Sequence, residues 1–116
     1  MIILLVIFGR NAFGQIVHIP DPNFKINLIK NILINTNGDS EIQESEAIAY
    51  NGAIEVVSSG INDLTGIGAF VNLKELRCDN NPFTHIDLSK NKELVLVSFV
   101  FNHLKALDLS NNKKLE

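Results

Sequence analysis

Three histidines and one cysteine are the first candidates for a catalytic base and a nucleophile in this 116-residue sequence. Enzymatic chemistry needs a nucleophile, a base and an orienting group that converge in one pocket. His18, His85 and His103 do not stand at equivalent positions of the repeat described below, and each is predicted to lie at the surface. Cys78 stands at a position predicted to face the core, which favours a buried thiol over a nucleophile or metal ligand. We therefore expect no enzymatic activity.

A second group of candidate residues lies between Asn35 and Glu46, where oxygen-bearing side chains recur. The segment NTNGDSEIQESE resembles the twelve-residue calcium loop of the EF-hand family, with Asn37, Asp39 and Glu46 at its third, fifth and twelfth positions. It departs from the family pattern where Asn35 replaces the first Asp and Ser40 replaces the Gly of the sharp turn. The ligands that this resemblance implies are the Asn35, Asn37 and Asp39 side chains, the Glu41 carbonyl, Gln43 through a water and bidentate Glu46.

Two of those side chains are carboxylates, and calcium affinity rises with the charge of the ligands. We therefore expect weak or absent Ca²⁺ binding at this loop and no other cofactor. The alternative that we favour is a helix–loop–helix unit that keeps the shape of an ancestral site without the ion.

An internal repeat in the sequence predicts the structural elements that position these residues. The segment from Leu73 to Phe83 reads L-x-x-L-x-C-x-x-N-x-F, and it returns 21 residues later as L-x-x-V-x-F-x-x-N-x-L. A second half, I-D-L-S-x-N, returns as L-D-L-S-x-N, and seven of the 21 positions are identical. A unit of this length cannot bury a core alone, so each is predicted to be one coil of a solenoid.

The spacing within each coil predicts a short strand followed by a bend. The pairs Leu76/Cys78 and Val97/Phe99 stand two residues apart and are predicted to point inward from parallel strands. An asparagine amide has donors and an acceptor for the backbone groups that a tight bend leaves without partners. The predicted ladder of structural asparagines comprises Asn81 and Asn102 at one bend and Asn91 and Asn112 at the opposite bend. Asn80, which precedes this ladder, is predicted to be an ordinary surface residue.

These motifs resemble the leucine-rich repeat family, whose consensus is L-x-x-L-x-L-x-x-N-x-L, over residues 51–116. The alternative is an amphipathic segment with chance leucine spacing. The resemblance implies an α/β solenoid with short parallel strands and 21-residue coils, incomplete at the C-terminus. Upstream, Ile54 and Val56 form the inward pair of a first coil, and Ser59 stands where the ladder asparagine is expected. Between Ile61 and Leu76 apolar residues recur every three positions, which fits tight turns or 3₁₀ segments.

The segment over residues 15–50 is predicted to form a small helical, EF-hand-like cap at the N-terminal end of the solenoid, because coil ends are apolar. Asp21 and Pro22 open a helix predicted to reach about Leu33, with Phe24, Leu28, Ile29, Ile32 and Leu33 on its apolar face. A short second helix is predicted from Glu46 to Tyr50. A helical cap before such repeats resembles that of internalin-like secreted bacterial proteins.

Residues 1–14 are predicted to be a signal peptide with a truncated n-region, because an apolar run, MIILLVIF, precedes small residues at Ala12 and Gly14. No Lys or Arg precedes the run, so we expect the coding start to lie upstream or the chain to be a fragment. The alternative is a buried first strand of the mature domain. The run is too short to span a bilayer, which needs about 20 residues. A net charge of −3 gives no electrostatic case for nucleic acid or an anionic membrane.

The strand residues between the inward pairs are predicted to point outward and to form a binding face. Bulky apolar groups in the later coil replace charged ones in the earlier coil, which is typical of an interaction surface. The alternative is that Phe101 packs under a following coil, or that this patch is exposed only because the chain is cut. The predicted face comprises Glu55, Val57, Glu75, Arg77, Asp79, Leu96, Ser98, Val100 and Phe101. We expect a secreted or cell-surface module that binds a protein or a glycan, in adhesion or host and matrix interaction. The alternative is an N-terminal repeat spacer of a larger secreted protein whose activity lies downstream.

Overall fold

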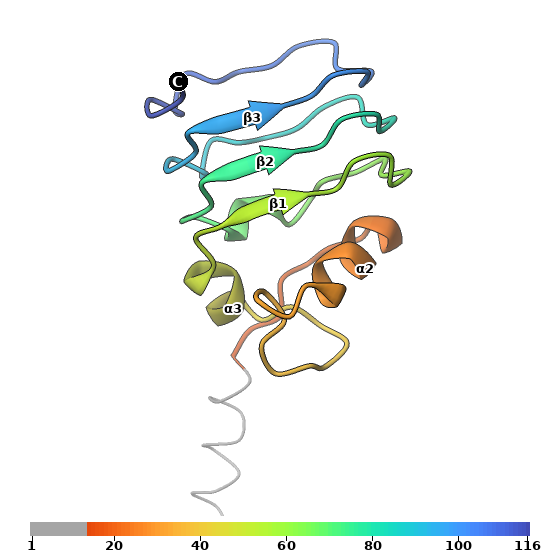
Figure 1. Cartoon of the computed structure of the whole chain (residues 1–116), viewed down its shortest axis with the longest axis vertical. Coiled ribbons are helices and arrows are strands. Elements are labelled where there is room, and N and C mark those ends of the chain that lie inside the picture. The colour runs from red at the N-terminus through yellow and green to blue at the C-terminus, as the bar shows by residue number, and fades with distance from the viewer. Residues whose placement is uncertain (1–13) are drawn as a thin grey trace, which may run out of the picture.

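The computed structural model describes residues 14–116, and the predicted signal peptide over residues 1–14 lies, apart from Gly14, outside them. Three short strands form one parallel sheet in the order β1 (Ala53–Glu55), β2 (Glu75–Arg77) and β3 (Leu96–Ser98). Each strand begins a coil that returns through the opposite wall before the next strand, as Figure 1 shows. The prediction of short parallel strands in a solenoid is confirmed.

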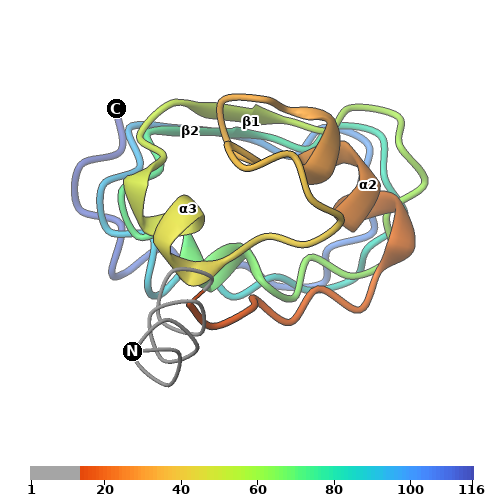
Figure 2. The same cartoon turned by 90° about the horizontal axis from the view of Figure 1, so that it is seen from below.

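Two helices, α2 (Pro22–Lys30) and α3 (Glu44–Ala49), lie beside the first coil at one end of the sheet (Figures 1 and 2). The Asp21 carboxylate caps α2, because its Oδ1 accepts hydrogen bonds from the backbone N–H groups of Asn23 and Phe24 at 2.9 and 3.1 Å. Its Oδ2 accepts from the N–H groups of Asn62 and Asp63 at 2.8 and 3.1 Å. One buried carboxylate therefore joins α2 to the first coil.

The prediction that α2 continues to Leu33 is wrong, since the helix ends at Lys30. Asn31 takes an extended conformation, and its Oδ1 accepts the backbone N–H of Leu33 at 3.0 Å, which turns the chain away from the helix. Ile32 and Leu33 are therefore exposed, and Ile34 is buried instead. The second helix begins at Glu44, two residues before the predicted start at Glu46, and ends at Ala49, one residue before the predicted end at Tyr50.

The core runs continuously from the helices through the coils. Phe24 and Leu28 of α2 lie in it, together with the inward strand residues Ile54, Val56 and Leu76. The apolar residues spaced by three are all buried, and one of their turns is the 3₁₀ helix η1 (Ile67–Ala69). In the third coil Val97 and Phe99 are half-buried against this core, and the Phe99 ring meets Phe83 edge to face at 6.2 Å.

None of the helices that the structure describes has the length and apolar character needed to cross a membrane.

Candidate functional site

The sheet aligns the outward residues of successive coils in columns. Ala53, Glu75 and Leu96 are register partners across the three strands, and so are Glu55, Arg77 and Ser98. The offset between partners is 22 residues from β1 to β2 and 21 residues from β2 to β3. The pairing continues past the strands, because the N–H of Ser58 donates to Asp79 O at 2.9 Å and that of Asn80 donates to Val100 O at 2.8 Å.

The charged part of this face is paired within itself. Arg77 Nη1 lies 2.9 Å from Glu55 Oε1 on the neighbouring strand and 2.6 Å from Glu75 Oε2 on its own strand. Exposed ion pairs of this kind contribute only about 0–1 kcal/mol to stability. Their effect is that the charges of Arg77, Glu55 and Glu75 are already paired with one another on this face.

Asp79 fixes the end of β3 relative to β2. Its Oδ1 accepts a hydrogen bond from Ser98 Oγ at 2.6 Å and another from the Val100 N–H at 2.7 Å. The carboxylate thus holds the backbone of Val100 in place, which positions the residue that follows, Phe101.

Two adjacent columns lie at the bend after each strand. The inner column contains Asn81, whose Oδ1 accepts the backbone N–H groups of Ser59 and Ile61 at 3.1 and 3.0 Å. Its Nδ2 donates to Val56 O at 2.7 Å, to Cys78 O at 3.0 Å and to Asp79 O at 3.2 Å. One buried amide therefore satisfies backbone groups of two coils.

Asn102, one coil further on, uses half of the same arrangement. Its Nδ2 donates to Cys78 O at 3.0 Å and to Asn81 O at 3.1 Å. Its Oδ1 is buried and finds no partner among residues 14–116. At the opposite bend Asn91 donates to Ile67 O and Phe70 O, and Asn112 donates to Leu88 O and Asn91 O.

The outer column, Ser58, Asn80 and Phe101, is left-handed at every coil, with φ of 52°, 58° and 59°. Asn tolerates this conformation, and the Asn80 amide also donates to Ser58 Oγ at 2.8 Å. Phenylalanine does not favour it, and the cost is about 1 kcal/mol. The Phe101 ring is nevertheless 82% exposed, so residues 14–116 do not recover this cost by burying the ring.

The binding-face prediction did not identify this column as strained. The sequence did contain a signal for it. Polar pairs follow the first two strands, Ser58-Ser59 and Asn80-Asn81, whereas the pair after the third strand is Phe101-Asn102. Val100, beside Phe101, is 53% exposed, and Val57 is 49% exposed. Leu96 is half-buried and adds less to this face than expected.

The loop that resembles a calcium site is closed by its own hydrogen bonds. Asn37 Nδ2 donates to Asp39 Oδ2 at 3.2 Å and to Gln43 Oε1 at 2.9 Å, while Gln43 Nε2 donates to the same Asp39 oxygen at 2.7 Å. The backbone N–H of Glu41 donates to Asp39 Oδ1 at 3.0 Å, and this bond is the main reason that the Asp39 pKa is lowered. The Asn37 and Gln43 amides thus donate to the Asp39 carboxylate at the place where a cation would have to bind.

Among the other predicted ligands, the Glu46 carboxylate is engaged by hydrogen bonds, whereas the amide oxygen of Asn35 is not. Asn35 Nδ2 donates to Ile29 O and Asp39 O, and Asn35 Oδ1 is buried without a partner within residues 14–116. Buried Glu46 accepts the N–H groups of Thr36 and Asn37 at Oε2 and that of Gln43 at Oε1. The side chain of Glu41, whose backbone carbonyl is the predicted ligand, pairs with Lys25 at 2.6 Å. These residues do not fit a calcium ion in this arrangement, and no group of three or more His, Cys, Asp or Glu side chains within the described chain is placed to hold a metal.

The candidate catalytic residues do not converge. His18, His85 and His103 are all exposed, as predicted. Cys78 is fully buried, and burial, with a smaller effect of the nearby Asp79 charge, raises the pKa of its thiol to about 12. The thiol is therefore protonated and inert at neutral pH.

This combination of parallel sheet, inward apolar residues and asparagine bends defines a leucine-rich repeat-like solenoid, and two Listeria internalins are among the solved structures similar to it. InlJ from Listeria monocytogenes, whose functional domain includes a cysteine ladder, is 28% identical with a TM-score of 0.73 over 87% of this chain. The internalin InlF from Listeria monocytogenes is 20% identical with a TM-score of 0.72 over 91% of this chain. Part of Clostridium perfringens ZmpB, solved as CBM51-2 with GlcNAc and INT domains, is 28% identical with a TM-score of 0.56 over 72% of this chain.

The chain spans 22% and 30% of the lengths of the two internalins and 17% of the ZmpB chain. No protein-family model matches the sequence, and no curated protein matches it. The comparisons therefore support an internalin-like repeat fold. The sequence holds a single cysteine, so it does not reproduce the cysteine ladder of InlJ.

Proposed function

We propose that this chain is the N-terminal part of a secreted or cell-surface leucine-rich repeat protein that binds a protein partner through the strand-lined face. The observation that supports the proposal is Phe101, an exposed aromatic ring held in a left-handed backbone conformation. Backbone strain that the fold does not repay is concentrated at functional sites. Val100 and Phe101 form the apolar anchor, and aromatic anchors of this kind contribute strongly to protein interfaces.

The partner we infer approaches the end of the strands rather than their middle. Around Arg77 the charges are already satisfied by Glu55 and Glu75, so a partner gains little there. At the strand ends the apolar anchor stands beside Asp79, whose carboxylate holds the Val100 backbone. The site is thus pre-organised before a partner arrives, which lowers the entropic cost of binding.

The test is adhesion of the purified chain, immobilised on a surface, to cultured epithelial cells and to extracellular-matrix proteins. Replacing Phe101 by Gly together with Val100→Lys should reduce retention at least about tenfold, a loss typical of an interface anchor. The matched control is Ile32→Lys with Leu33→Lys, two similarly exposed aliphatic residues that follow α2 at the other end of the molecule. Equal losses in both variants would show non-specific hydrophobic capture.

A spacer role is the second candidate, because the self-paired charges of Glu55, Glu75 and Arg77 suit an inert surface. It is supported if the wild-type chain is retained by none of these surfaces. Secretion is tested separately by expressing the gene with its own start and sequencing the N-terminus of the exported product. An N-terminus at Gln15 supports a signal peptide over residues 1–14, and an exported protein that retains those residues excludes it.

We further propose that residues 15–50 form the N-terminal cap of the solenoid and need no calcium. Support comes from the Asp21 bridge to the first coil and from Phe24, Leu28 and Ile42, which are buried in the shared core. Calorimetric titration of the whole chain with Ca²⁺ should show no binding tighter than about 10⁻⁵ M, the weak limit for calcium sensors. A tighter site would show that the loop opens its hydrogen bonds around the ion.

A further inference from the structure

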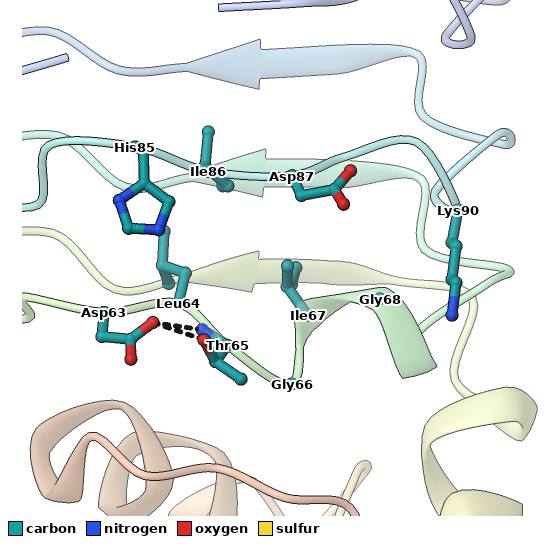
Figure 3. A pocket seen from close by; sticks show the side chains of 10 residues that line it. All are labelled: Asp63, Leu64, Thr65, Gly66, Ile67, Gly68, His85, Ile86, Asp87 and Lys90. Carbon is teal, nitrogen blue, oxygen red and sulfur yellow. Dashed lines mark hydrogen bonds between the residues drawn. The ribbon is translucent and has the colours of Figure 1, made fainter. Parts of the chain in front are cut away.

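A groove of about 320 Å³ lies on the wall opposite the strands, between the first and second coils (Figure 3). Its floor is apolar and comes from Leu64, Ile67 and Ile86. Its rim is polar and comes from Asp63, Thr65, His85, Asp87 and Lys90. The volume is at the lower end of the range of about 300–1,000 Å³ that small-molecule sites occupy. The strand-lined face proposed above does not use any of these residues.

Two glycines of the first coil line this groove, and they face different neighbours. Gly66 has φ of 109°, and a Cβ built there would lie 2.8 Å from Ile19 Cγ1 and 2.9 Å from the His18 carbonyl oxygen. The segment before α2 therefore packs against bare backbone on this side of the coil. A Cβ at Gly68 would meet Lys90 Cδ at 3.5 Å, an ordinary contact, so Gly68 is open to the groove rather than required by the fold.

The polar groups of the rim are held by local turns. Asp63 Oδ1 accepts the Thr65 N–H at 2.8 Å and the Thr65 hydroxyl at 2.6 Å, so the carboxylate is fixed in this turn (Figure 3). Asp87 repeats the turn with Ser89, whose N–H donates to Asp87 Oδ1 at 2.9 Å. The bonds from Thr65 and Ser89 are the main causes that lower the pKa of these two carboxyl groups, so both are ionised at neutral pH.

The mixed charges around the groove disfavour strongly charged ligands. The rim carries two carboxylates, one ammonium and one imidazole, so an anion would meet Asp63 and Asp87, and a polycation would meet Lys90. A neutral ligand that both donates and accepts hydrogen bonds suits such a rim. Sugar hydroxyls donate to carboxylates and accept from ammonium and imidazole N–H groups, while the C–H face of a sugar ring can lie on an apolar floor.

We propose that this groove binds a neutral saccharide of one or two rings, with Asp63 and Asp87 accepting its hydroxyls and Lys90 and His85 donating to it. The site lies on the other wall from the proposed protein-binding face, and it stands whether or not that face binds a partner.

The test is a titration of the ¹⁵N-labelled whole chain, followed by amide chemical shifts, with glucose, galactose, N-acetylglucosamine, lactose and cellobiose. Inorganic sulfate and a lysine dipeptide serve as charged probes. At least one neutral sugar should shift the amides of Thr65, Gly66 and Gly68 in a saturable manner, while the Glu75 and Leu96 amides of the strands stay unchanged. Shifts only with the charged probes, or none with any sugar, overturn the proposal.

Three variants link the shifts to the groove. Asp63→Asn should weaken binding about tenfold, because a bound hydroxyl loses a charged acceptor while the turn to Thr65 is kept. Gly68→Leu should abolish binding by filling the groove. The matched control is Asp108→Asn, since Asp108 forms the same turn, with Ser110 at 2.9 Å, but lies outside the groove. Loss of binding in the control, or full binding in Gly68→Leu, contradicts the assignment. Amide spectra of each variant show whether it has remained folded.

Discussion

Two columns of residues stand side by side at the strand ends, and they serve different purposes. The inner one is Ser59, Asn81 and Asn102. The Asn81 and Asn102 side chains turn into the bend and bind backbone groups of neighbouring coils, while the Ser59 hydroxyl donates to Val57 O of its own coil. The outer one, Ser58, Asn80 and Phe101, shares a strained backbone but turns its side chains to solvent. In the inner column, the asparagine side chains stabilise the fold through hydrogen bonds. In the outer column, Phe101 has a strained backbone and no such bonds from its side chain. The comparison therefore separates residues that the fold needs from a residue that it only tolerates.

The largest effect is expected at the inner column. Asn81→Ala removes an amide that makes five hydrogen bonds and leaves buried backbone groups without partners. Unpaired buried groups cost about 1–3 kcal/mol each, and partial relaxation should give a total loss of about 3 kcal/mol. Denaturant melts of the whole chain measure it. A loss below about 1 kcal/mol would show that water or rearranged backbone replaces the amide.

Asn102→Ala sharpens the same comparison within the inner column. It makes two hydrogen bonds, and its own oxygen is buried without a partner, so its removal also relieves an unfavourable group. We expect a loss of about 1 kcal/mol in the same melts. If Asn102 proved as costly to remove as Asn81, the number of bonds would not explain the energetics of the ladder.

Asn80 tests the outer column. It was predicted to be an ordinary surface residue, and that prediction did not include its left-handed backbone conformation. Because its φ is 58°, Asn80→Ala should cost about 1 kcal/mol, whereas Asn80→Gly should stay within about 0.5 kcal/mol of the wild type. Equal melts for the two variants would show that the left-handed conformation is not a constraint here.

The stability contributed by the turns of the opposite wall should depend on pH at acid values, whereas that contributed by the asparagine ladder should not. The folded-state pKa of Asp63, Asp87 and Asp108 is lowered, mainly by hydrogen bonds from Thr65, Ser89 and Ser110. The stability that they contribute is present above the unfolded value of 3.8 and is lost as pH falls through the folded pKa. Asp87→Asn with Asp108→Asn keeps the turns but should make the melting temperature fall less between pH 5 and about pH 3. Carboxamides do not titrate, so the loss caused by Asn81→Ala should be the same at both ends of this range.

The strands and the inward residues could be predicted because the repeat presents them twice. Ile54 and Val56 follow the same rule and are buried, although the first coil is 22 residues from the second and has a serine at the ladder position. What could not be predicted depends on contacts across coils or on one local bond. The end of α2 depends on the Asn31 side chain, which competes with the helix for the backbone.

Neither the groove nor the hydrogen bonds inside the loop could be predicted from the repeat pattern. The groove depends on contacts between coils, where Gly68 of the first coil lies against Lys90 of the second. In the loop, the spacing of oxygen-bearing side chains matched a calcium site. It did not show that the Asn37 and Gln43 amides turn their donors toward Asp39.

The most direct measurement is the paired effect of Phe101→Gly on stability and on adhesion. Glycine adopts a φ of 59° without strain, and little apolar area is lost because the ring is exposed. We expect the free energy of unfolding to stay equal or to rise by up to about 1 kcal/mol, while retention on the partner surface falls at least about tenfold. If the variant instead unfolds more easily and adheres as well as the wild type, Phe101 serves the fold, and the proposed binding face is wrong.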